Sequence, residues 1–245
     1  MITGVGRVGQ SCVVSRMSGS TPSATLTGMT QRTVVVEPNG EHAEIDTALA
    51  RDAIAGLLGA DPDVRRRIAE LVELEPERFA PPVLFALSEV LLDQGRPTEA
   101  AFWFYAAQVR ARFDANRCTD GTAGAAVGAL TERFGGPINR FAFTDPQRLR
   151  RTVVRAVLWD RRTPHAYDHR WIALHGMGAF TGATGPLSVP VAEWDTLARR
   201  TRAEYLAGLR EALRGLPRHG NSRPRPSTAR SKGSRSGCGG GGPHP

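Results

Sequence analysis

Three histidines and an aspartate lie close together in the sequence and are the first candidates for chemistry. They are His165, Asp168, His169 and His175. In a helical turn, His165 and His169 would share one face at a spacing of i and i+4, which is half of a zinc site. His175 could supply a third nitrogen if the chain bends back at Gly176. The same side chains could act as general acids or bases.

The surroundings of this histidine segment, residues 165–175, weaken the case for a metal. Helical zinc proteases place a glutamate directly after their first histidine, and here Ala166 takes that position. Hydrogen bonding and packing around Trp171 is the favoured interpretation, and we predict no metal and no cofactor. Cys118 has no activating neighbour in the sequence, which favours a buried, inert thiol over a nucleophile.

A second candidate is a polar cluster that follows the most apolar stretch of the chain. Its members are Arg110, Arg112, Asp114, Asn116 and Arg117. Arg110 and Arg117 are seven residues apart and lie on one helix face, where Asp114 can pair with either. Such a face either emerges into water, forms ion pairs or lines a polar pocket. We expect it to line a cleft opposite the histidine segment.

Several common chemistries are disfavoured by single positions. Lys232 is the only lysine and lies near the C-terminus, so the body of the chain cannot form a Schiff base or complete a Walker A loop. Residues 4–9 have the spacing of a dinucleotide fingerprint, but no strand fits before them and no acid occurs before Glu37. Residues 114–121 begin like a calcium loop, yet the twelfth position is Ala125 rather than a glutamate.

The elements that must position these residues are predicted to be helices. Apolar residues recur with a helical period along residues 33–216, which predicts an all-α bundle of about seven helices. Proline after Asp61 and after Asp145 marks two helix starts, since proline fits the first helical position. Residues 135–137, Gly-Gly-Pro, predict a helix end, and residues 33–36 predict a short strand. The predicted helices cover about 41–59, 62–75, 81–94, 97–115, 123–134, 146–162 and 190–216.

The run from Ala100 to Ala107 is apolar on every side. A helix without a polar face is enclosed by its neighbours, so we predict that this run forms the central core helix. The alternative is that its aromatic side chains line a ligand pocket.

Residues 81–112 predict a helix, a tight turn and a second helix that folds back. The pattern is carried by Leu84, Phe85, Ala86, Leu87, Leu91, Gly95, Ala100, Phe104 and Ala107. It resembles a single tetratricopeptide or Sel1-like repeat, with Leu84 in place of the usual tryptophan and Arg112 in place of the closing proline. One repeat is insufficient for a solenoid. The resemblance implies helix-pair packing and a groove that binds a protein or peptide.

The formal charge of +8 belongs to the two ends of the chain. Residues 217–245 contain six basic residues and no acid, and residues 1–30 contain two and no acid, so residues 31–216 are near neutral. A neutral body argues against a broad basic face and against specific nucleic-acid binding. We predict that residues 1–32 and 217–245 are disordered, because they lack apolar side chains to bury. Met29 is a candidate start of translation.

The favoured function is a non-enzymatic helical module that binds another protein or peptide, with the polar cluster as its anchors. The alternative is a small metal-dependent or acid–base hydrolase that uses the histidine segment. The histidine segment lacks the complete residue spacing of a metal site or a catalytic triad, which favours the interaction module over the hydrolase. No apolar run approaches the length that spans a bilayer, and the three cysteines are too widely spaced for a disulfide framework, so we predict a cytoplasmic protein. The sequence indicates neither the biological process nor the oligomeric state.

Overall fold

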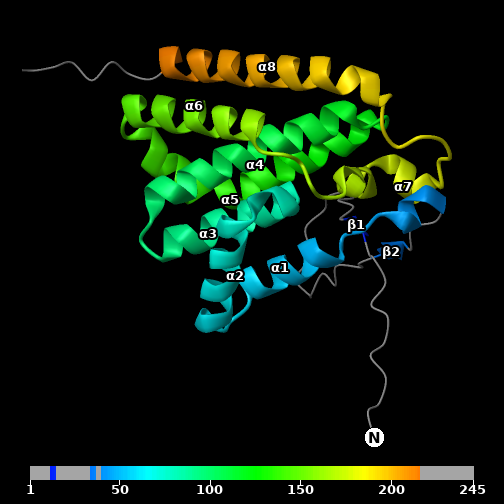
Figure 1. Cartoon of the computed structure of the whole chain (residues 1–245), viewed down its shortest axis with the longest axis horizontal. Coiled ribbons are helices and arrows are strands. Elements are labelled where there is room, and N and C mark those ends of the chain that lie inside the picture. Colours follow the sequence, from blue (N-terminus) through cyan, green and yellow to red (C-terminus); the bar gives the residue numbers. More distant parts are fainter. Residues whose placement is uncertain (1–11, 15–33, 37–39, 216–245) are drawn as a thin grey trace, which may run out of the picture. The chain divides into compact units, whose positions relative to one another are not determined.

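The computed structural model describes residues 12–14, 34–36 and 40–215, which form an all-α bundle with one small β-ribbon (Figure 1). The α-helices are α1 (Ala48–Leu58), α2 (Pro62–Leu74), α3 (Pro81–Asp93), α4 (Pro97–Arg117), α5 (Ala125–Phe143), α6 (Pro146–Arg162), α7 (Met177–Thr181) and α8 (Trp194–Gly215). The 3-10 helices are η1 (Gly40–Glu44), η2 (Pro76–Arg78), η3 (Gly121–Gly124), η4 (His169–His175) and η5 (Val191–Glu193). The predicted fold class is confirmed.

Strands β1 (Cys12–Val14) and β2 (Val34–Val36) pair antiparallel, with Cys12 opposite Val36. The strand expected at residues 33–36 is therefore present, and its partner lies inside the segment that we expected to be disordered. The rest of both expected tails, including Met29, lies outside the described residues.

The helix starts follow from the caps seen in the sequence. The Asp61 side chain accepts hydrogen bonds from the backbone N–H groups of Asp63 and Val64 at the start of α2. Asp145 caps α6 in the same way. Each cap satisfies amides that have no partner within the helix.

Helix α4 is the centre of the bundle, enclosed by α3, α5, α6 and α8 (Figure 1). Every residue from Ala100 to Ala107 is buried, which confirms the predicted core helix. Helices α3 and α4 form a hairpin whose turn contains Gly95 with a positive φ of 73°, a conformation that glycine adopts without strain. The residues of the proposed repeat therefore do form a helix pair.

Helix α5 contradicts the predicted helix end at residues 135–137, because it continues through Pro137 to Phe143. Gly135 faces the ring of Phe104 on α4, and a Cβ at Gly135 would lie 2.8 Å from Cζ of that ring. The glycine therefore permits close approach of α5 to α4 instead of ending the helix. The helices predicted above leave residues 163–189 unassigned, and within that range residues 169–181 form η4 and α7.

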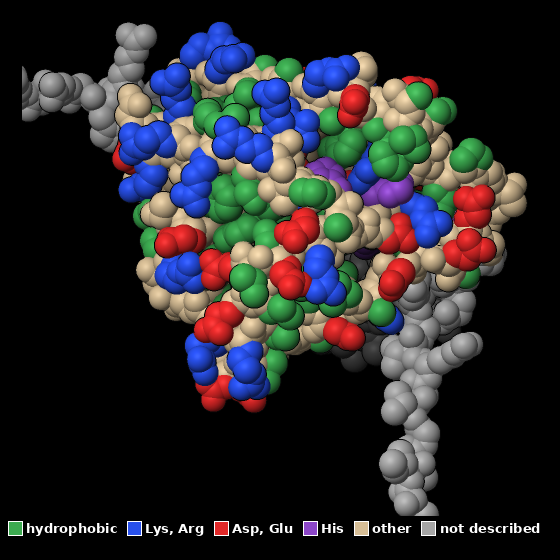
Figure 2. All heavy atoms as spheres, viewed as in Figure 1, with side chains coloured by type: hydrophobic (Ala, Val, Ile, Leu, Met, Phe, Trp, Pro, Cys, Tyr) green, Lys and Arg blue, Asp and Glu red, His purple; other side chains and the backbone are tan. Residues whose placement is uncertain are grey.

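The charges of the described residues are separated in space, although they nearly cancel in sum. Residues 40–99 contain thirteen carboxylates and six arginines, whereas α6 and α8 together contain eleven arginines and four carboxylates. In Figure 2 the blue side chains gather over α6 and α8, and most red ones lie over the lower part of the bundle. The inference from a neutral body to the absence of a basic face was wrong, because a sum of charges hides their separation.

No helix in the described ranges carries an apolar stretch long enough to cross a membrane.

Candidate functional site

The polar cluster and the histidine segment meet around the buried carboxylate of Asp114. Its Oδ2 accepts hydrogen bonds from the Tyr167 hydroxyl at 3.0 Å and from Nε1–H of Trp171 at 2.7 Å. Its Oδ1 accepts from Arg117 at 2.6 Å. Burial, followed by the nearby charge of Asp114, raises the pKa of Tyr167 well above its ordinary value, so this hydroxyl stays a donor.

A second buried carboxylate, Asp160 on α6, joins three other segments. Its Oδ1 lies 3.0 Å from Nε2 of His165 and 3.3 Å from Nε of Arg110, and its Oδ2 lies 2.7 Å from Nε of Arg202 on α8. Burial alone would raise the pKa of Asp160, but the hydrogen bond with His165 and the charges of Arg202 and Arg110 hold it below its ordinary value. Arg110 also donates to the backbone carbonyls of Thr163 and Pro164.

His169 lies near Arg117 and packs against Trp194. The Arg117 guanidinium sits over the rings of Phe113 and Trp194, at 4.5 and 4.6 Å from their centroids. Nε2 of His169 lies 2.8 Å from Oγ of Ser188. Burial and the charge of Arg117 lower the pKa of His169, so the imidazole is neutral at pH 7.

The remaining predicted residues have separate positions. Arg112 and Asn116 line a polar hollow of about 530 Å³ between α4, α5 and α8, where Asn116 donates to the Thr201 hydroxyl. Asp168 caps η4 and pairs with Arg170 at 2.7 Å. Cys118 is half-buried, and burial raises the pKa of its thiol, so the thiolate is disfavoured.

The structure thus brings the two predicted groups together, but in a closed network. Arg110 and Asp114 are fully buried and Arg117 is 3% exposed, and none of the three lines the hollow of about 530 Å³ or the pockets described below. Their partners come from the loop after α6, from η4 and from α8. The geometry gives these three residues the role of fixing the position of the histidine segment against α4.

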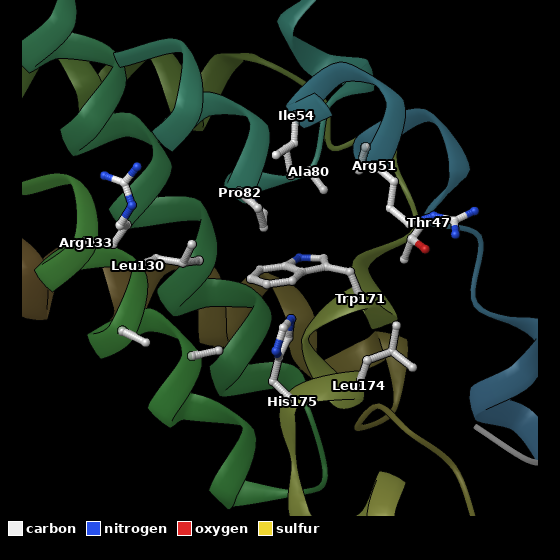
Figure 3. A pocket seen from close by; sticks show the side chains of 13 residues that line it. Thr47, Arg51, Ile54, Ala80, Pro82, Leu130, Arg133, Trp171, Leu174 and His175 are labelled. Atoms are coloured by element: carbon white, nitrogen blue, oxygen red, sulfur yellow. The ribbon is translucent and has the colours of Figure 1, made fainter. Parts of the chain in front are cut away.

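A pocket of about 470 Å³, which we call the Trp171 pocket, shares Trp171 with this network (Figure 3). Its walls come from α1, α3, α5 and η4, and most of its surface is apolar. The lining residues are Thr47, Ala50, Arg51, Ile54, Ala80, Pro82, Ala126, Ala129, Leu130, Arg133, Trp171, Leu174 and His175. Its volume lies within the range of ligand-binding pockets.

Trp171 and His175 connect this pocket to the buried network. Figure 3 shows the indole of Trp171 lying across the middle of the pocket, with the His175 ring beside it. The indole is held in place by its hydrogen bond to Asp114 and has an edge contact with His175. The ring nitrogens of His175 form no hydrogen bond with any described residue, and desolvation by the pocket walls lowers its pKa. His175 is therefore an accessible, neutral polar group in an apolar pocket.

Most lining residues of the Trp171 pocket were missed by sequence reasoning. Ile54, Pro82 and Leu130 are ordinary apolar positions on three different helices, and no local motif distinguishes them from core residues. Trp171 was assigned to packing, and His175 was the only lining residue among the predicted site residues.

Three histidines, cysteines or carboxylates do not come together in a metal-binding arrangement anywhere in the described part of the chain. Comparison with known proteins found no family model, curated protein or solved structure that matches this chain.

Proposed function

We propose that this chain is a non-catalytic, cytoplasmic protein-interaction module whose Trp171 pocket receives an apolar side chain of a partner polypeptide. The observation that carries the proposal is a preformed apolar pocket whose central indole is held by a buried carboxylate. Trp171 is itself only 3% exposed, so its indole acts as a rigid part of the pocket wall, and a preformed pocket avoids the cost of ordering side chains on binding.

The hollow next to the pocket supports a polypeptide as the occupant. It has a volume of about 290 Å³ and shares Ala50, Ala80 and Trp171 with the pocket, but polar side chains such as Asp46 and His165 also line it. An elongated ligand with an apolar group and a polar neighbour fits this pair of compartments. The proposed resemblance of residues 81–112 to a tetratricopeptide or Sel1-like repeat, a class that binds peptides, supports the same function.

The test is to select binding peptides from a random phage-displayed library on the full chain and to measure their affinity for two matched variants. Ala129 lines the pocket and is exposed, so Ala129→Trp fills the pocket without disturbing the core. Ala125 is an exposed alanine of the same helix that does not line it. We expect Ala129→Trp to weaken binding by about tenfold or more and Ala125→Trp to leave it unchanged. Equal binding to both variants would contradict the proposal.

The hydrolase alternative has one specific observation in its favour, the hydrogen bond between His169 and Ser188 at 2.8 Å. A neutral histidine at this distance is suited to accept the proton of a serine nucleophile. A fluorophosphonate probe, followed by mass spectrometry of the labelled peptide, tests it with Ser188→Ala as the control. The interaction module predicts no labelling of Ser188, whereas stoichiometric labelling would establish the hydrolase.

A further inference from the structure

The outer side of α6 combines arginines with aliphatic residues in one helical stripe. We call this stripe the α6 face and define it as Arg151, Val154, Arg155, Leu158 and Arg162. Spacings of three, four, seven and eleven residues place all five on the same side of the helix. None of them lines the Trp171 pocket, so the α6 face is independent of the function proposed above.

The aliphatic part of the α6 face is accessible and slightly recessed. Val154 is 37% exposed and Leu158 is 41% exposed. Together with Phe102 of α4 and Trp159, the stripe lines a shallow hollow of about 630 Å³. The Phe102 and Trp159 rings meet edge to face at 6.0 Å, so the floor of the hollow is aromatic.

The charged part of the α6 face forms no salt bridge within the described residues, although Arg151 is close enough to Asp145 to contribute to lowering the pKa of that carboxyl. Arg151, Arg155 and Arg162 form no ion pair there, and Arg155 instead lies 4.1 Å over the ring of Phe102. The acidic residue of α6, Asp160, is buried and already pairs with Arg110 and Arg202. The α6 face therefore presents three guanidinium groups without a salt bridge around an apolar strip.

The ends of the chain lack the charge needed to cover this face. Residues 217–245 contain six basic residues and no acid, and residues 1–30 contain no acid either. These two segments therefore do not neutralise the face.

We propose that the α6 face binds an amphipathic helix of another protein that carries glutamate or aspartate beside leucine-like side chains. Carboxylates would pair with the three arginines, and aliphatic side chains would enter the hollow between them. Guanidinium groups bind carboxylates through paired hydrogen bonds, and helix-in-groove recognition uses apolar anchors at this helical spacing.

A helix fits these observations better than a nucleic acid or a membrane does. Phosphate groups would use the arginines but gain nothing from exposed Val154 and Leu158. A flat lipid surface would contact protruding apolar groups, whereas these two residues border a recess.

The test uses fluorescence anisotropy with a fluorescein-labelled peptide of three Leu-Glu-Glu-Leu-Leu-Glu-Glu repeats and the full chain. Arg155→Glu is expected to weaken binding by about tenfold or more. Its matched control is Arg150→Glu, the same change at an exposed arginine of α6 that does not line the hollow. Leu158→Asn is expected to weaken binding as well, whereas Leu74→Asn at an exposed leucine of α2 is expected to have no effect.

Four outcomes would overturn the proposal. Equal losses in Arg155→Glu and Arg150→Glu would show nonspecific charge attraction, and unchanged binding in Leu158→Asn would remove the apolar contact. Tighter binding of a single-stranded oligonucleotide or of phosphatidylserine vesicles than of the peptide, with the same dependence on Arg155, would assign the face to nucleic acid or to lipid. A dimer seen by light scattering and lost in Arg155→Glu would identify a second copy of this chain as the occupant.

Discussion

The two halves of α4 contribute to the core in different ways, since the first is entirely buried and apolar and the second is mostly buried but carries charged side chains. From Ala100 to Ala107 the helix is apolar and is enclosed by aromatic and aliphatic side chains. From residue 108 to 117 it carries Arg110, Asp114 and Arg117, which are also buried but are paired with groups from α6, η4 and α8. The first half is specified by shape and hydrophobicity, and the second by the matching of individual donors and acceptors. The following substitutions test this comparison, from the largest expected effect to the smallest.

Trp103→Ala tests the apolar half. Trp103 is 7% exposed and has edge contacts with Phe102 and Trp159 at 4.9 and 5.2 Å between ring centroids. Its loss should lower the free energy of unfolding by about 4 kcal/mol, because a large cavity replaces the indole. Urea denaturation followed by circular dichroism measures the change. An unchanged urea midpoint would show that the apolar half tolerates the loss of a large buried side chain.

Asp114→Ala tests the polar half. Its removal leaves Arg117, Tyr167 and Trp171 without their buried acceptor, and the expected loss of stability is about 3 kcal/mol. Asp93→Ala is the control, because Asp93 forms an exposed ion pair with Arg65 and should cost less than about 1 kcal/mol. Similar small effects for both variants would mean that the buried network contributes no more than a surface pair.

Combining Asp114→Ala with Tyr167→Phe measures the coupling within the network. Two residues that share a buried hydrogen bond should have non-additive effects, with a coupling energy above about 0.5 kcal/mol. Additive losses would indicate that Tyr167 is held by packing alone.

Gly135→Ala tests how closely the apolar half is packed. The new Cβ would lie 2.8 Å from Cζ of Phe104, so the expected loss is about 1–2 kcal/mol. In Gly128→Ala, at an exposed glycine of the same helix, the new Cβ would meet nothing within 4 Å, and a small gain is expected because alanine favours the helix. The difference between these two glycines of α5 is measured by thermal unfolding, and equal effects would argue against close packing of α5 on α4.

The pH dependence of stability contrasts the open pocket with the closed network. The pKa of His175 is lower in the folded chain than its ordinary value, so the unfolded chain binds more protons as the pH falls below about 6.5. The contribution of neutral His175 to the free energy of unfolding is therefore fully present above that pH and is lost as the pH falls below it. His175→Gln should reduce the decrease between pH 7.5 and 5.5 in urea titrations. An unaltered profile would assign the effect to His169, whose pKa is lowered in the same direction.

Much of this fold could be predicted from the sequence because its signals are local. Proline after a capping aspartate located the starts of α2 and α6, and the uniform hydrophobicity of residues 100–107 located the core. The course of α5 could not be predicted, since Gly135 looks like a helix terminator unless the position of Phe104 is known.

The candidate site was less predictable for the same physical reason. The polar cluster was seen in the sequence, but its burial depends on partners such as Trp171, which lies 57 residues from Asp114. The Trp171 pocket arises from segments that are brought together only by folding, and the hollow beside the α6 face depends in the same way on Phe102 of α4. Their residues are individually ordinary.

The long sequence separations within the buried network have a consequence for the order of folding. Asp114 binds Tyr167 across 53 residues, and Asp160 binds Arg202 across 42, whereas the α3–α4 hairpin closes through a turn of a few residues. Contacts between distant segments cost more chain entropy and form late, so the hairpin is expected to nucleate folding before these carboxylates find their partners. Contacts that form after the transition state affect mainly the rate of unfolding. Substitutions in the network are therefore expected to speed unfolding and to leave the folding rate nearly unchanged.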